Sequence, residues 1–342
     1  LLGFSPFYNY TSQPTRILGH IARVSPRGLR PWQRSLGFTD SVESREINQS
    51  SLFRVASVTK MFTATLVLQL WEEGMVDLDA PFNDYLQLDE ATHPKIPLFE
   101  NVLVRHLLSH RSGVPYISST TFFDVYGYES PIEQSDKIRV LFTEGEPVFE
   151  PGTEYSYSNS NFTILGLLIE AVTGMQYHEA LRERICSRIG LTTTGVLDYD
   201  IPGDDRRFAH GYFHDFDGTD YHGTHGWASG GLVSNVRELT LFMRALVDGR
   251  LFQDPSTFDL MVTPVAGGHY GMGMFITQTP RGVSYGHGGA VFGYNTKLEY
   301  FPGLDVVVAA NLTFNGIDFV TLNWVDDFYM PALAEVQRAL DR

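Results

Sequence analysis

The chain has 342 residues, of which 43% are hydrophobic and only 19% are charged, so it can bury a large core and we do not expect disorder. A formal net charge of −15 repels a nucleic-acid backbone and an anionic membrane surface, which excludes both as general partners. The single cysteine rules out an intramolecular disulfide, and no apolar run reaches the roughly 20 residues of a membrane span. We therefore expect a soluble protein, whether cytoplasmic, periplasmic or secreted.

In chain order, two apolar segments at 17–24 and 32–38 flank a turn rich in Pro, Gly and Arg, which predicts an antiparallel hairpin. Residues 58–73 are apolar on most faces and are followed by Gly74, so we expect a buried helix there. Later patterns predict helices at 104–109, 161–172, 178–189 and 235–247, and strands at 273–278, 283–286, 295–301 and 305–310.

The late strands can pair with the N-terminal hairpin, and a last helix at 322–340, kinked or interrupted by Pro331, would cover one face of that sheet. This order predicts an α/β (α+β) fold, an antiparallel sheet flanked by helices plus a mostly helical lobe. We expect one domain over 1–342. Its sheet would lie in about 1–80 and 200–342, and its helical lobe in about 81–199.

Ser57 and Lys60 form an SxxK pair at the start of the buried helix. A spacing of three places both side chains on one face, about a turn apart. A buried amine has a lowered pKa and can take the proton of a serine hydroxyl, which makes the serine a nucleophile. The alternative is a serine N-cap with an exposed lysine, but the chain has only four lysines and none of the other three follows a serine at this spacing.

Tyr157 and Asn159 form a YxN triplet between a Pro/Gly turn and the helix expected at 161–172. They are therefore predicted to lie on a loop at the mouth of a helix, where catalytic groups are often held. Because the chain contains 17 tyrosines, a structural aromatic side chain is the alternative.

The run His287-Gly288-Gly289-Ala290 is expected at the end of a strand. Two glycines let a substrate backbone lie close to the strand edge and leave backbone N–H groups available to an oxyanion. A purely structural histidine is an equal alternative, because His269 opens a second HxG pattern.

Taken in order, SxxK at 57, YxN at 157 and HxG at 287 resemble the boxes of the serine β-lactamase and penicillin-binding-protein superfamily. The similarity is strongest to its class C-like esterase and D-aminopeptidase or amidase branch. Further segments that look like this branch are FRVA at 53–56, VRHLLSHRSG at 104–113, SGGLVS at 229–234 and GYN at 293–295. The resemblance covers about 17–311.

This resemblance implies a β-lactamase/transpeptidase-like fold with its site between the sheet and the helical lobe. It implies that Ser57 attacks, and that Lys60 and Tyr157 share the general base and acid work. Asn159 would orient Lys60 and the substrate, and the backbone N–H groups of Ser57 and Ala290 would form the oxyanion hole. No cofactor is implied, and the partner is a small-molecule or short-peptide substrate.

Where many penicillin-recognising members carry Lys-Thr-Gly, this chain has His287, Gly288 and Gly289, which lack a firm cation and a hydroxyl for a substrate carboxylate. We therefore expect a serine hydrolase acting on ester or amide bonds, including D-amino-acid amides or short D-peptides. The alternatives are a β-lactamase or D-alanyl-D-alanine carboxypeptidase, an acyltransferase, and a non-catalytic scaffold or sensor. Protonation of His287 would restore a cation, so carboxylate substrates should gain towards pH 5.5.

Two other histidine-bearing segments are left outside the catalytic set. His110, in the LLSHRSG run, is expected to cap and pack a helix end. The acidic, His-rich segment 210–227 contains His210 and His214 at a metal-ligand spacing for a helix, but its Gly, Asp and aromatic residues favour a loop. We expect no metal there.

Overall fold

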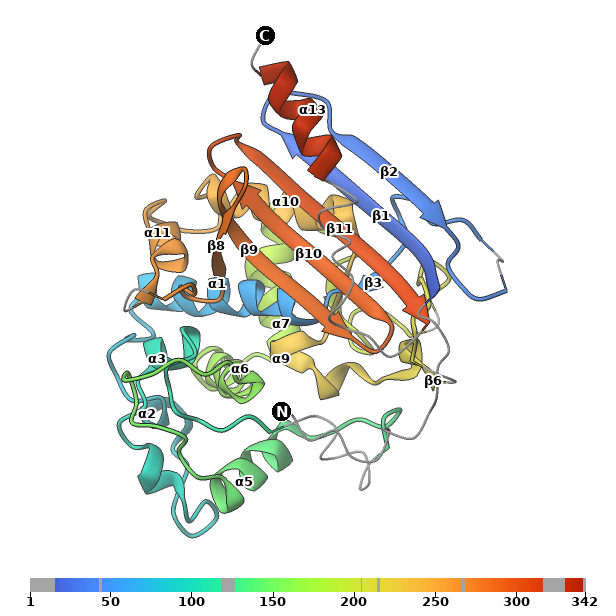
Figure 1. Ribbon diagram of the computed structural model, residues 1–342. Helices are drawn as coiled ribbons and strands as arrows, with labels where there is room; N and C mark the ends of the chain where they lie inside the picture. Colours follow the sequence, from blue (N-terminus) through green and yellow to red (C-terminus); the bar gives the residue numbers. More distant parts are fainter. Residues whose placement is uncertain are drawn as a thin grey trace.

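The computed structural model describes residues 16–42, 45–117, 127–203, 205–213, 216–265, 268–315 and 330–340. Its main feature is an antiparallel sheet in the order β2-β1-β11-β10-β9-β8, seen face-on in Figure 1. Strand β1 pairs with β11, so the N-terminal hairpin joins the late strands as predicted. The bounds are β1 (Arg16–Pro26), β2 (Trp32–Gly37), β8 (Phe275–Thr279), β9 (Gly282–Val291), β10 (Tyr294–Phe301) and β11 (Val306–Asn315).

Helices cover this sheet, and most of them lie between β2 and β8 in the chain. The helices predicted at 58–73, 104–109, 161–172 and 235–247 are present within two residues of their expected ends. The one predicted at 178–189 consists of α7, a π-helical turn and α8. The helix bounds are α1 (Thr59–Glu72), α2 (Asn83–Leu86), α3 (Val104–Leu108), α5 (Gln134–Glu144), α6 (Asn159–Thr173), α7 (Tyr177–Leu181), α8 (Ser187–Ile189), α9 (Trp227–Gly230), α10 (Val236–Val247), α11 (Thr257–Val262) and α13 (Met330–Leu340).

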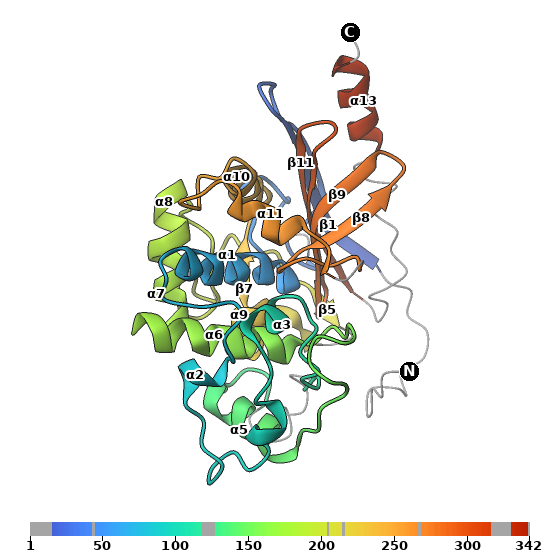
Figure 2. The same ribbon diagram turned by 90° about the vertical axis from the view of Figure 1, so that its left-hand side faces the viewer.

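Strand β11 is buried on both faces, which explains its nearly continuous apolar run. Val306 and Val308 belong to one core cluster together with Leu333 of α13. Val307 and Ala309 point to the opposite face and join the larger core. Figure 2, in which the sheet is seen nearly edge-on, shows α13 on one side and α1 and α10 on the other. The fold is therefore an antiparallel sheet with helices on both faces, as the sequence predicts.

Helix α1 carries the sequence that follows Ser57 into the core. All of its residues from Thr59 to Leu70 are buried. It packs against α6, α7 and α9, and Phe62 stacks on Phe242 of α10 with ring centroids 3.6 Å apart. Burial therefore extends to Lys60 in the first turn. Within the described ranges, no helix is both long and apolar enough to cross a membrane.

A small second sheet, in the order β3-β7-β4, was not predicted. Strands β3 (Phe53–Arg54), β7 (Leu232–Ser234) and β4 (Gly195–Val196) are two or three residues long, which is too short for an alternating pattern to be recognised. Two further short strands, β5 (Tyr212–Phe213) and β6 (Phe216–Asp217), pair next to β11. The β3-β7 pair ties the segment before Ser57 to the segment after Ser229.

Two predicted strands are longer than expected. The strand predicted at 283–286 is part of the ten-residue strand β9, and the one predicted at 305–310 continues to Asn315 in β11. Helix α13 covers 330–340 of the predicted last helix and contains Pro331, and the kink or interruption expected at Pro331 stays a prediction. The rest of that predicted helix, 322–329, lies outside the described residues.

Candidate active site

Ser57 lies in a 3-10 turn, η1 (Ala56–Val58), that runs directly into α1, and Lys60 is the second residue of that helix. Lys60 Nζ is 3.1 Å from Ser57 Oγ. Ala56 has a φ of +47°, a left-handed conformation that costs a non-glycine residue about 1–2 kcal/mol and that its surroundings must hold. The turn leaves Ser57 partly exposed while Lys60 is fully buried.

The Lys60 side chain is held by two oxygen acceptors from distant parts of the chain. Its Nζ donates to Asn159 Oδ1 and to the carbonyl oxygen of Ser229, each at 2.7 Å. Burial lowers the pKa of Lys60 well below 10.5, because the ammonium form loses its solvation. An amine with a lowered pKa, at hydrogen-bond distance from a serine hydroxyl, is suited to accept its proton.

Tyr157 lies in the loop that leads into α6, and its ring is 4.9 Å from Lys60 Nζ. It shares a side-chain hydrogen bond with Ser57, and burial raises its pKa above the usual 10. The Tyr157 hydroxyl is therefore protonated near neutral pH, so the Lys60 amine is the group available to accept a proton in the free protein, and Tyr157 is placed to pass a proton on. Asn159 was predicted to lie on this loop, but it is the first residue of α6.

Strand β9 passes close to Ser57, and the predicted HGGA run lies within it rather than at its end. Strand β8 pairs only with residues 282–286, so among the described strands β9 has no partner on that edge from His287 onwards. A Cβ at Gly289 would lie 2.1 Å from the Val55 carbonyl oxygen, so only glycine allows this approach to the segment before Ser57. Gly288 has more room, and Ala290 is exposed.

His287 is buried, with 3% of its surface exposed. Its Nε2 lies 3.2 Å from the Tyr270 hydroxyl, and its ring packs against Phe275 with centroids 4.9 Å apart. Burial, and to a smaller extent the charge of Lys60, lowers the pKa of His287 to about 3. The expectation that His287 becomes a cation near pH 5.5 is therefore wrong, because the imidazole stays neutral throughout that range.

The structure adds residues that the sequence analysis left outside the site. The carbonyl of Ser229 contacts Lys60, and the His110 ring lies 4.2 Å from the Tyr157 ring. Ser229 lies in the SGGLVS segment and His110 in the LLSHRSG segment, both of which carried the family resemblance. That resemblance was the only indication in the sequence that these two residues lie near the site. Tyr270 had no such signal, and it joins the site through its hydroxyl contact with His287 and its ring contacts with His110 and Tyr157.

The His-rich segment 210–227 does not assemble a metal site within the described residues, where no group of three His, Cys, Asp or Glu side chains is placed to hold an ion. His210 Nδ1 lies 2.6 Å from Asp217 Oδ2, and this pairing raises the pKa of His210. His214 and Asp215 lie outside the described residues.

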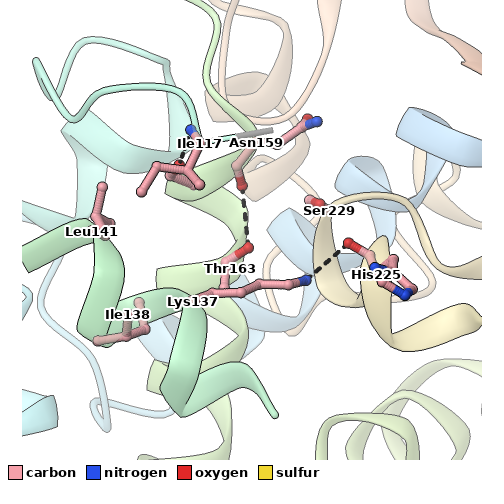
Figure 3. Close-up of a pocket in the computed structure, with 9 residues that line it drawn as sticks. Ile117, Lys137, Ile138, Leu141, Asn159, Thr163, His225 and Ser229 are labelled. Atoms are coloured by element: carbon pink, nitrogen blue, oxygen red, sulfur yellow. Dashed lines mark hydrogen bonds between the residues drawn. The ribbon is translucent and has the colours of Figure 1, made fainter. Parts of the chain in front are cut away.

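A small cavity of about 20 Å³ adjoins the site, and Asn159 and Ser229 are among the residues that line it (Figure 3). Its volume suits about one water molecule. Lys137 extends from α5 along this cavity and donates hydrogen bonds to the carbonyl oxygens of Thr224 and His225 at 2.9 and 2.8 Å. Burial lowers the pKa of Lys137 to about 7. Lys137 therefore ties α5 to the segment that leads to Ser229.

A protein-family model described as Beta-lactamase matches residues 11–325. Penicillin-binding protein 4* of Bacillus subtilis (strain 168) is 30% identical over 54% of this chain and 39% of that protein. Esterase EstB of Burkholderia gladioli is 29% identical over 53% of this chain and 48% of that protein. The chain therefore matches less than half the length of these two relatives.

A solved structure of similar length covers nearly the whole chain. The D-amino acid amidase from Ochrobactrum anthropi SV3, complexed with L-phenylalanine amide, superposes with a TM-score of 0.80 at 25% identity, over 95% of both chains. The sheet with its flanking helices is thus shared along the chain and not only around the SxxK segment.

Proposed function

This chain belongs to the beta-lactamase family, and on that premise we propose that it is a serine hydrolase that cleaves ester or amide bonds through an acyl-enzyme on Ser57. The observation that carries the proposal is the buried Lys60 amine 3.1 Å from the Ser57 hydroxyl. A nucleophile and a base at this distance, with the base oriented by a third group, form the arrangement expected for covalent catalysis. Here Asn159 supplies that orientation.

In the first step, neutral Lys60 accepts the hydroxyl proton of Ser57 as Oγ attacks the substrate carbonyl carbon. The negative charge that develops on the carbonyl oxygen is stabilised by the backbone N–H groups of Ser57 and Ala290. This assignment is supported by the position of β9, which Gly289 allows to lie against the segment before Ser57.

In the second step, the tetrahedral intermediate expels its leaving group, which takes a proton from the Tyr157 hydroxyl. Lys60 returns the proton to Tyr157, and the acyl group remains on Ser57. The high pKa of Tyr157 suits this role, because the hydroxyl is protonated when the leaving group needs a proton. Deacylation repeats the steps in reverse, with water in place of the leaving group.

The proposal for the substrate class is supported by β9. Its edge beyond β8 offers backbone groups to an extended substrate, and His287, Gly288 and Gly289 supply neither a cation nor a hydroxyl for a carboxylate next to the scissile bond. Because His287 is neutral, we propose simple esters, D-amino-acid amides and short D-peptides rather than penicillins or D-alanyl-D-alanine peptides.

The test combines active-site labelling with a substrate screen. A fluorophosphonate should label the wild-type protein, and peptide mapping should place the label on Ser57. The screen should include p-nitrophenyl esters, D- and L-amino-acid amides, a β-lactam and an alcohol acyl acceptor. Absence of label on a folded wild-type protein would leave only a scaffold or sensor, while faster transfer to the alcohol than to water would indicate an acyltransferase.

A further inference from the structure

His110 lies directly behind the segment that carries Tyr157 and Asn159. It follows α3 and is fully buried, and its φ is +56°, a backbone conformation that residues other than glycine adopt at an energetic cost. Its ring lies 4.2 Å from the Tyr157 ring. A buried histidine in a strained conformation against a proposed catalytic group needs an explanation beyond filling space.

The contacts of His110 bracket Tyr157 and Asn159. Its Nδ1 accepts a hydrogen bond from the backbone N–H of Ser158 at 3.2 Å and lies 3.1 Å from Asn161 Nδ2. Its carbonyl oxygen accepts from the backbone N–H of Ser156 at 3.0 Å. His110 is therefore hydrogen-bonded to residues that precede and follow both Tyr157 and Asn159 in the chain.

The direction of the bond from Asn161 is set by its other partner. Asn161 Oδ1 accepts a hydrogen bond from Ser112 Oγ at 2.7 Å, so the amide nitrogen of Asn161 faces His110 and donates to it. His110 Nδ1 must then be an unprotonated acceptor. Burial keeps it so, because it lowers the pKa of His110 well below 6.5.

We propose that His110 is a positioning residue that holds the Tyr157 hydroxyl and the Asn159 amide in reach of Lys60. It acts through these two residues, by the two hydrogen bonds that Nδ1 accepts and by the packing of its ring on Tyr157. This inference rests on the proposed function of Ser57, Lys60 and Tyr157. The sequence predicted only a capping and packing role for His110, and the inference adds that His110 also sets the geometry of proton transfer.

The chain offers a matched control in His106, which lies within α3, the helix that ends two residues before His110. His106 Nδ1 accepts the backbone N–H of Leu103 at 3.2 Å, so it is also a histidine acceptor at a helix end. A merely structural role for these caps predicts that the same substitution at 106 and 110 lowers activity in proportion to the loss of stability. A positioning role predicts that activity falls only for position 110.

Two substitutions separate the acceptor from the bulk of the side chain. His110→Asn keeps an acceptor oxygen close to the place of Nδ1 and tolerates a positive φ better than other non-glycine residues. His110→Phe keeps a ring against Tyr157 but leaves the N–H of Ser158 without its acceptor. The same pair of changes is made at His106.

We would measure kcat and KM for a p-nitrophenyl ester, the rate of fluorophosphonate labelling, and the melting temperature of each variant. His110→Phe should lower kcat and the labelling rate about 30- to 100-fold with KM within threefold, because a displacement of about 1 Å at reacting groups costs about 100-fold. His110→Asn should recover to within fivefold of wild type. Both His106 variants should stay within threefold.

Equal losses in His110→Phe and His106→Phe, or no recovery in His110→Asn, would overturn the positioning role. If His110→Phe does not fold, Ser112→Ala decides: release of the Asn161 amide should lower kcat three- to tenfold at unchanged KM, and an unchanged kcat would overturn the proposal. Failure of the proposed function gives a different result, since wild type would then take no label or Ser57→Ala would still be labelled.

Discussion

Gly289→Ala tests how tightly β9 must lie against the residues before Ser57. A Cβ at position 289 would lie 2.1 Å from the Val55 carbonyl oxygen and 3.1 Å from the Ala56 Cβ. Real Cβ atoms do not approach other atoms closer than 3.0 Å, so the strand and this segment must separate by at least 0.9 Å. The shift falls on Val55, and it is passed to Ala56, which precedes Ser57 and already has a strained φ.

The expected magnitude follows from that displacement. A misplacement of about 1 Å between the nucleophile and the groups that stabilise the oxyanion costs about 100-fold in rate. Overpacking a close contact also costs about 1–3 kcal/mol of unfolding free energy. We therefore expect kcat/KM to fall about 100-fold and the melting temperature to fall as well, in a variant that still folds.

The assay is hydrolysis of a p-nitrophenyl ester, with fluorophosphonate labelling and thermal melting in parallel. Gly303→Ala is the control, because a Cβ there has no heavy atom within 4 Å and the residue lies on the turn between β10 and β11. That variant should match wild type within twofold in all three measurements. A Gly289→Ala protein with kcat/KM within threefold of wild type would refute the argument that this contact sets the active geometry.

The other predictions concern the proton-transfer groups and His287. Ser57→Ala should fold and lose nearly all turnover, and turnover within tenfold of wild type would exclude Ser57 as nucleophile. Lys60→Ala and Tyr157→Phe should each lower kcat at least ~100-fold, while independent, multiplicative losses in the double variant would contradict a shared proton-transfer unit. Neutral esters and amides should have a higher kcat/KM than penicillins, by roughly ten- to a hundredfold for each charge-assisted hydrogen bond that the penicillin carboxylate lacks. Because the pKa of His287 is about 3, the ratio of the two kcat/KM values should stay constant from pH 7.5 to 5.5. The lowered pKa of His287 also means that, between pH 6.5 and 3, the unfolded chain binds a proton at this residue that the folded chain does not. Wild type should therefore lose stability as the pH falls through this range. The melting temperature of His287→Phe should fall less over the same range.

Elements that repeat their pattern over several periods were predictable from the sequence. The N-terminal hairpin, α1, α10 and β10 lie within two residues of their expected ends. Strand β9 was predicted too short because Gly286, Gly288 and Gly289 interrupt its pattern, yet it persists because β10 pairs along it. The two-residue strand β3 contains no pattern to read.

The sequence by itself determined the Ser57 and Lys60 pair, because a spacing of three within one helical turn brings two side chains together wherever that helix lies. Only the tertiary structure decided that Asn159 and Ser229, 99 and 169 positions further along the chain, supply the acceptors for Lys60. It also decided that His287 is a buried neutral imidazole, which removes the pH response expected for it between pH 7.5 and 5.5. The physical reason is that spacing is a local property, whereas the solvation and hydrogen-bond partners of a side chain come from residues that are distant in sequence and meet only when the core is packed.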